Sequence, residues 1–157
     1  QLCNMWHYRL QPEYDYGCTR MDQVIKGSCL CKKLAYEVPG SVDIIDYCHC
    51  SRCRKASGSA FAAVTSVSRS NFKITKGNQY LKSYVTEENF ERVFCSECGS
   101  QLYSIRPALI DTIRLRLGSI DSPIAGTVSA HIFASFKASW HDICDKAPQY
   151  EERRPNP

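Results

Sequence analysis

Short runs of apolar residues recur from Gly27 onward, and a turn former interrupts each run after a few residues. Such spacing is typical of a protein built mainly from β-strands. The clearest run is Thr112–Leu117, in which apolar residues alternate strictly with polar ones. This alternation predicts a half-buried strand with Arg114 and Arg116 on its polar face, because successive side chains of a strand point to opposite sides. The other predicted strands are Leu30–Val38, Ala60–Val67, Phe72–Thr75, Gln79–Val85, Arg92–Phe94, Gln101–Ile105 and Ala130–Phe133.

The remaining segments complete a prediction of one mainly β domain over residues 27–150. Residues 1–26 combine turn formers and aromatics without a clear period, which predicts an irregular N-terminal extension. Residues 151–157 are charged or proline-rich and predict a disordered tail. A brief helical turn is expected at Cys53–Ser57, and neither long amphipathic helices nor internal repeats are found in the sequence.

The composition narrows the class of protein. The 157 residues are 43% apolar, which is enough to build a core for one domain. No run of 18 apolar residues occurs and the start lacks a signal-like segment, so a soluble, cytoplasmic protein with no membrane partner is expected. The net charge is +4, with 20 basic and 16 acidic residues interspersed. This dispersion argues against a nucleic-acid partner and is compatible with an anionic small molecule.

Ten cysteines are the strongest chemical signal in the chain. Seven of them lie in three close groups: Cys29 and Cys31; Cys48, Cys50 and Cys53; Cys95 and Cys98. Cysteines so close in sequence rarely achieve disulfide geometry with each other, but their thiolates converge readily on one cation. The spacing therefore favours metal binding. Cys3, Cys18 and Cys144 are isolated and are interpreted as buried or incidental thiols.

Two of the three groups predict a closed structural zinc site with the ligands Cys29, Cys31, Cys95 and Cys98. Such a site needs four ligands, usually delivered as two close pairs from turns. Gly99 follows Cys98 directly, where a turn around a metal often requires a positive φ. Because the pairs are far apart in sequence, a zinc ion here would join two distant parts of the domain.

The third group, Cys48, Cys50 and Cys53, predicts a second zinc ion with an open position. Three ligands on a tetrahedral ion leave the fourth place for water or substrate. A zinc ion held by three thiolates is a poor activator of water, but it suits exchange with an incoming thiol. The thiolate of that incoming molecule then attacks an electrophilic carbon. An alternative interpretation is a second structural site completed by His49 or by a distant ligand.

Basic and hydroxyl side chains surround this open group. Arg52, Arg54 and Lys55 offer cations that could receive the carboxylates of an anionic thiol, and Ser57 offers a hydroxyl donor. The alternative interpretation is that these basic residues are solvated charges on a surface turn, which would have the same sequence. His49 and His131 are interpreted as structural histidines rather than as acid–base groups.

Together these motifs resemble the glutathione-dependent formaldehyde-activating enzyme family, which includes the centromere protein V domain. The resemblance extends from about Gly27 to Tyr150 and rests on four stretches: GSCLC at 27–31, CHCSRCRKASGS at 48–59, FCSECGS at 94–100, and His131-Ile132-Phe133 with Trp140.

This resemblance implies an Mss4-like β-tent fold and a carbon–sulfur lyase activity. It implies two zinc ions per chain, with Cys29, Cys31, Cys95 and Cys98 structural and Cys48, Cys50 and Cys53 catalytic. The namesake reaction joins glutathione, as co-substrate, to formaldehyde, although some members act in biosynthetic pathways on larger electrophiles. The extension over residues 1–26 does not match the family core. Two further hypotheses are a non-enzymatic binding module of the centromere protein V type and a purely structural zinc scaffold.

Overall fold

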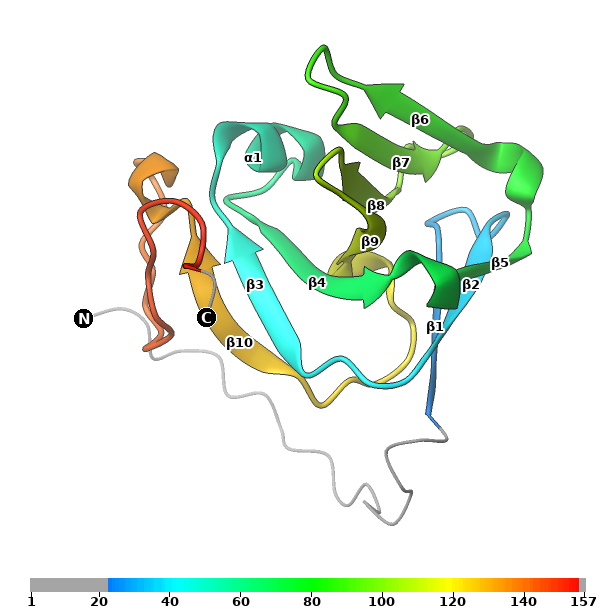
Figure 1. The fold of residues 1–157 in the computed structure, drawn as a ribbon, viewed down its shortest axis with the longest axis horizontal. Helices are drawn as coiled ribbons and strands as arrows, with labels where there is room; N and C mark the ends of the chain where they lie inside the picture. The colour runs from blue at the N-terminus through cyan, green and yellow to red at the C-terminus, as the bar shows by residue number, and fades with distance from the viewer. Residues whose placement is uncertain (1–22, 156–157) are drawn as a thin grey trace.

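The protein, seen here as a computed structural model that describes residues 23–155, consists of two β-sheets, one short α-helix and four 3-10 helices of three residues each (Figure 1). The smaller sheet has the strand order β1-β2-β5, and the larger one the order β10-β3-β4-β9-β8-β7-β6. Within the larger sheet β10 and β3 run parallel, and the other pairs are antiparallel. The prediction of a mainly β protein is confirmed.

The elements have the following bounds. The smaller sheet is formed by β1 (Val24–Ser28), β2 (Ala35–Pro39) and β5 (Lys73–Lys76). The larger sheet is formed by β3 (Ile44–Cys48), β4 (Ala62–Ser68), β6 (Leu81–Val85), β7 (Glu91–Cys95), β8 (Gln101–Arg106), β9 (Leu109–Arg116) and β10 (Thr127–Ile132). The helix α1 is Ser51–Ser57 and connects β3 to β4.

The main hydrophobic core lies where the two sheets meet. Leu34, Leu102 and Leu115 are fully buried there, and Tyr36 is 1% exposed. The Tyr36 hydroxyl shares a hydrogen bond of 2.8 Å with the Oγ of Ser119, so its polar end is satisfied inside the core. A smaller cluster around Cys48, Ala130 and Ile132 packs beneath the helix.

Two strands were not predicted, and one predicted strand is much shorter than expected. β1 begins at Val24, ahead of the expected start of the domain at Gly27, and β3 precedes the second cysteine group. The predicted strand Leu30–Val38 contains a turn instead, with Lys32 at φ 61° and a hydrogen bond of 3.0 Å from the Cys29 amide to the Leu34 carbonyl. Apolar content alone does not distinguish this turn from a strand.

The C-terminal segment also departs from expectation. Residues 151–155 were expected to begin a disordered tail, but the amide of Phe133 donates to the carbonyl of Glu152 at 2.7 Å. The guanidinium of Arg154 donates to Asp46 in β3 at 2.8 Å. These bonds hold the described part of the segment beside β10 and β3 (Figure 1).

Some of the sequence predictions concern residues that the structure does not describe. Most of the predicted N-terminal extension, with Cys3 and Cys18, lies outside the described residues. Cys144, which was interpreted as a buried or incidental thiol, is exposed. Within residues 23–155 no helix has the length and apolar character needed to cross a membrane.

Candidate metal centres and active site

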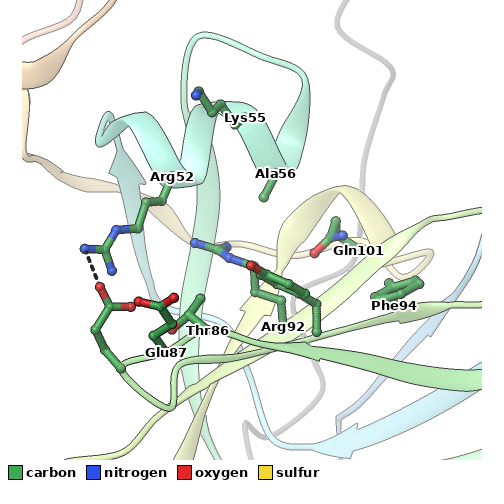
Figure 2. A pocket seen from close by; sticks show the side chains of 10 residues that line it. Arg52, Lys55, Ala56, Thr86, Glu87, Arg92, Phe94 and Gln101 are labelled. Carbon is green, nitrogen blue, oxygen red and sulfur yellow. Dashed lines mark ion pairs between the residues drawn. The ribbon is translucent and has the colours of Figure 1, made fainter.

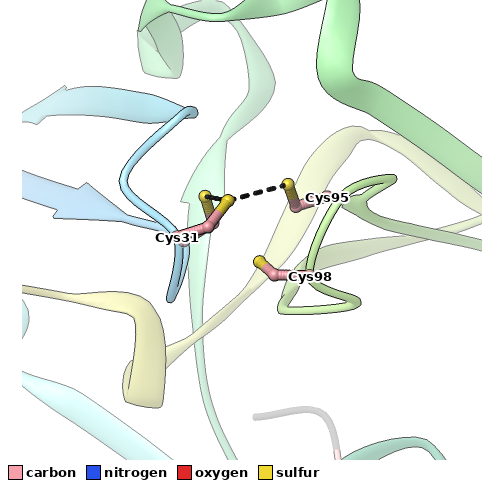
Figure 3. Close-up of side chains that lie close together, drawn as sticks. Cys31, Cys95 and Cys98 are labelled. Carbon is pink, nitrogen blue, oxygen red and sulfur yellow. Dashed lines mark hydrogen bonds between the residues drawn. The ribbon is translucent and has the colours of Figure 1, made fainter.

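The four cysteines of the predicted closed site converge on one point from both sheets. Cys29 and Cys31 lie in the turn between β1 and β2, whereas Cys95 ends β7 and Cys98 lies in the turn before β8 (Figure 3). Their sulfur atoms all lie within 4.8 Å of one another. The sulfur atoms are 3.4 Å apart in the pair Cys29–Cys31 and 3.9 Å apart in the pair Cys31–Cys95.

This donor set fits a zinc ion. Four sulfurs at zinc–sulfur distances of about 2.3 Å around a tetrahedral ion lie roughly 3.8 Å apart, close to the separations seen here. Gly99 has φ 74°, as predicted, and its amide donates to the carbonyl of Cys95 at 2.8 Å. The turn can therefore place Cys98 opposite Cys95 without steric strain at Gly99.

The second group is built at the junction of β3 and α1. Cys48 is the last residue of β3, Cys50 is the N-cap of α1, and Cys53 lies in the first turn of the helix. The amide of Cys53 donates to the sulfur of Cys50 at 3.4 Å, and the sulfurs of Cys48 and Cys50 are 3.6 Å apart. All three sulfurs lie within 4.8 Å of one another, and no further histidine, cysteine or carboxylate of residues 23–155 joins the group.

The charges around this second group favour a thiolate at Cys53. Hydrogen bonds from Cys48 and Cys50 hold the pKa of Cys53 well below its ordinary value, and the positive charges of Arg116 and Arg92 act in the same direction. The pKa of Cys48 is raised well above its ordinary value, first by its hydrogen bonds to Cys50 and Cys53 and then by burial. A divalent cation would displace the remaining thiol protons.

His49 does not complete the cysteine group but enters a buried chain of polar side chains. Its Nε2 lies 2.9 Å from Nδ1 of His131, whose Nε2 lies 3.0 Å from the carboxylate of Asp145. When His131 is neutral and donates to Asp145, its Nδ1 accepts from Nε2 of His49, so Nδ1 of His49 carries a lone pair. That atom is buried without a hydrogen-bond partner among the described residues. Burial, followed by the charges of His131 and His141, lowers the pKa of His49 to about 4, which keeps the ring neutral.

Two cavities adjoin the helix that carries the second cysteine group. The larger has a volume of about 610 Å³ and is lined by residues from α1, β6, β7 and β8; the smaller has a volume of about 420 Å³. Ala56 and Gln101 line both cavities, so the two spaces adjoin. Figure 2 shows the larger cavity, with Arg92 in its middle and Arg52 at its edge.

Of the residues proposed from sequence as substrate contacts, three line the cavities and one does not. Arg52 and Lys55 line the larger cavity, and Ser57 lines the smaller one. Arg52 also forms an ion pair of 3.4 Å with the exposed Glu88. Arg54 lines neither cavity, because its Nε donates to the carbonyl of His49 at 3.2 Å. Arg54 therefore supports the β3–α1 connection.

Three residues near the second cysteine group were not proposed from sequence: Arg92, Gln101 and Arg116. Arg116 was placed on the polar face of a half-buried strand, but it is only 5% exposed, since α1 and its neighbours cover that face. Arg92 is 7% exposed. The sequence carried no signal for either burial, because Arg116 ends an alternating strand and Arg92 lies at the start of β7, where an exposed arginine gives the same pattern.

The fold and these two cysteine groups define a β-protein with two candidate metal centres, one closed and one with three ligands. The family described as glutathione-dependent formaldehyde-activating enzyme matches residues 24–136. The chain therefore belongs to the glutathione-dependent formaldehyde-activating enzyme family.

Individual relatives agree with this assignment. A protein of Aspergillus flavus that bears the family name is 28% identical over 138 residues, which are 85% of this chain and 66% of the relative. An uncharacterised lyase of Schizosaccharomyces pombe is 30% identical over 78 residues, 50% of this chain and 55% of its own length. The chain thus spans at most about two thirds of the length of these two relatives.

One solved structure supports the fold. The crystal structure of a Rhodobacter sphaeroides protein superimposes with a TM-score of 0.53 at 21% identity, covering 64% of this chain and 91% of that protein. At this identity the likeness concerns the fold alone.

Proposed function

We propose that this chain is a zinc-dependent carbon–sulfur lyase that joins a thiol to an aldehyde at the group formed by Cys48, Cys50 and Cys53. The observation that carries the proposal is the convergence of three thiols with no fourth protein ligand in residues 23–155. Membership of the family, whose name specifies glutathione and formaldehyde, supports these two molecules as substrates. A larger carbonyl compound from a biosynthetic pathway is an alternative electrophile at the same site.

Zinc is the proposed metal at both groups. Cys29, Cys31, Cys95 and Cys98 would hold a structural ion, and Cys48, Cys50 and Cys53 would hold the second. Sulfur donors select soft or borderline metals, and the sulfur separations match a tetrahedral ion of this size. At the open position zinc would supply a Lewis acid that favours the thiolate form of an incoming thiol at neutral pH. Reduced thiols at this density also support a cytoplasmic location.

The atoms of the proposed reaction balance without an oxidant. A carbon–sulfur bond forms between the thiol sulfur and the aldehyde carbon, the carbonyl π bond becomes a hydroxyl, and the thiol proton ends on that oxygen. With glutathione and formaldehyde the product is S-hydroxymethylglutathione. The chain's own contribution is to bind and orient the thiol in the adjoining cavities, where Arg52 and Lys55 add positive charge and Ser57 a hydroxyl.

Replacement of one ligand tests this function. We expect Cys53→Ser to bind one zinc ion instead of two and to lose formation of the glutathione–formaldehyde adduct by on the order of 100-fold or more, because the open site depends on all three thiolates. Metal content measured by mass spectrometry and adduct formation followed by NMR provide the two readouts. Circular dichroism should show an intact fold.

Cys144→Ser is the matched control, since Cys144 is exposed and belongs to neither group. It should keep two zinc ions and full turnover. A Cys53→Ser protein with two zinc ions and unchanged turnover would contradict the proposed site. A wild-type protein with two tightly held zinc ions that resist exchange with added thiols would instead indicate a structural scaffold.

A further inference from the structure

Two buried arginines beside the second cysteine group carry hydrogen-bond donors without partners. Arg92 and Arg116 are 7% and 5% exposed, respectively. Nη1 of Arg92 and both Nε and Nη2 of Arg116 are buried and have no hydrogen-bond partner among the described residues. Leaving a buried charged donor unpaired costs more free energy than leaving a neutral one, so such groups normally face an anion.

A third arginine of the same strand face, Arg114, has a carboxylate partner and serves for comparison. Arg114 lies two residues before Arg116 in β9, so the two side chains leave the strand on the same face. Arg114 forms an ion pair of 3.6 Å with Asp46. No carboxylate of residues 23–155 forms an ion pair with Arg92 or Arg116.

The metal group accounts for only one of the two positive charges. Three thiolates and one divalent ion have a formal charge of −1, and Arg116 lies next to Cys53. Arg92 and Arg116 together contribute +2. At least one unit of positive charge therefore remains for a ligand.

The cavities show where that ligand would lie. Arg92 lines the larger cavity, Arg116 the smaller one, and Gln101 both, with the Oε1 of Gln101 buried and unpartnered. In Figure 2 Arg92 lies beneath α1, with Arg52 and Glu87 on one side and Gln101 on the other. The acidic residues of this cavity, Glu87 and Glu88, are exposed, and Glu88 is paired with Arg52.

We propose that Arg92 and Arg116 bind a carboxylate of the thiol substrate and thereby make the site selective for carboxylate-bearing thiols. This inference rests on the proposed function for the identity of the ligand as a thiol. Gln101 accepts an N–H of the same ligand through Oε1. The site consequently prefers an anionic thiol to a neutral or cationic thiol of the same size.

The test compares two thiols of similar size on the zinc-loaded full chain. Isothermal titration calorimetry with 3-mercaptopropionate and with 2-mercaptoethanol gives a selectivity ratio. For the wild type we expect a ratio of about ten or more, the value of one charge-assisted hydrogen-bonded pair. Arg92→Met should reduce the ratio to near one without weakening binding of 2-mercaptoethanol, and Arg92→Lys should restore part of it.

Arg114→Gln is the matched control, because it removes an arginine from the same face that already has Asp46 as its partner. Its selectivity ratio should equal that of the wild type. A ratio near one in the wild type, or an unchanged ratio in Arg92→Met, would overturn the proposal. Zinc content and the melting temperature of each variant show whether the site and the fold are preserved.

The results distinguish a failure of this inference from a failure of the proposed function. Selective carboxylate binding in a protein that turns over no thiol and aldehyde would leave the arginine site standing and remove the lyase activity. Turnover with both thiols at equal efficiency, without selectivity in binding, would leave the lyase activity standing and remove the arginine site.

Discussion

Tyr36 is a residue whose ionisation is coupled to folding. Its ring lies in the core where the two sheets meet, 1% exposed, and burial raises the pKa of its phenol from 10.0 to about 12. Between these two pH values the unfolded chain releases the proton while the native protein keeps it. The buried neutral phenol therefore stabilises the fold fully below pH 10, and this contribution is lost as the pH rises through 12.

We accordingly expect alkaline destabilisation that depends on Tyr36. Two pH units correspond to about 3 kcal/mol of the free energy of unfolding. Tyr36→Phe should lose about 1 kcal/mol at pH 8, from the hydrogen bond to Ser119, but decline less steeply than the wild type between pH 10 and 12. Urea denaturation at pH 8 and pH 11 measures both effects.

Tyr84→Phe is the comparison, since Tyr84 is 62% exposed. Its stability should fall with pH as steeply as that of the wild type. If Tyr36→Phe also declined in parallel with the wild type, the coupling between this phenol and folding would be disproved.

At the scale of elements, β1 and β2 approach so closely that one position admits no side chain. Gly27 in β1 pairs with Tyr36 in β2, and a Cβ at Gly27 would overlap the phenol of Tyr36 and the carbonyl of Ser119. The constraint is steric, because Gly27 is not among the glycines with positive φ. The strand pair that leads into Cys29 thus depends on this glycine.

Gly27→Ala should destabilise the protein by about 2 kcal/mol or more, because overpacking a buried site displaces both the tyrosine and the backbone. Thermal or chemical denaturation measures the loss. Gly118→Ala is a suitable control: a Cβ there meets nothing within 4 Å, and its stability should stay within about 0.5 kcal/mol of the wild type. Equal stabilities for the two variants would show that the strands can move apart at no cost.

At the scale of the whole molecule, the four-cysteine group joins the two sheets. Cys29 and Cys31 come from the turn of the smaller sheet, and Cys95 and Cys98 from the β7–β8 connection of the larger one. A metal ion held there cross-links segments that are distant in sequence. Its binding free energy is then coupled to the folding of the entire domain.

Loss of this site should therefore be more damaging than loss of the three-cysteine site. We expect Cys98→Ser to lower the free energy of unfolding by several kcal/mol, or to prevent folding, whereas Cys53→Ser keeps its melting temperature to within a few degrees. Melting temperature and metal content, measured at increasing chelator concentration, would show the order of loss. Equal thermal stability of Cys98→Ser and the wild type would contradict a structural metal.

The sequence was sufficient to predict much of the candidate site and the class of the fold. Local spacing placed seven cysteines in three groups, the need of a closed zinc site for four ligands joined two of these groups into one set, and the structure brings each resulting set together. The positive φ of Gly99 and the positions of eight of the ten described strands could also be predicted, since turn chemistry and alternation are local properties. The turn at 29–34 and the strands β1 and β3 were missed, because short apolar segments have the same composition in strands and in turns.

By itself, the sequence determined which residues can hold metal, because ligand chemistry and close spacing are properties of the chain. Only the tertiary structure decided that Arg92 and Arg116 lie beside the open cysteine group, that Gln101 lines both cavities, and that Arg54 lies away from them. Those placements depend on the pairing of β7, β8 and β9 and on the position of α1 beside β4. The burial and charge of a side chain are set by its neighbours in space, which local pattern does not encode.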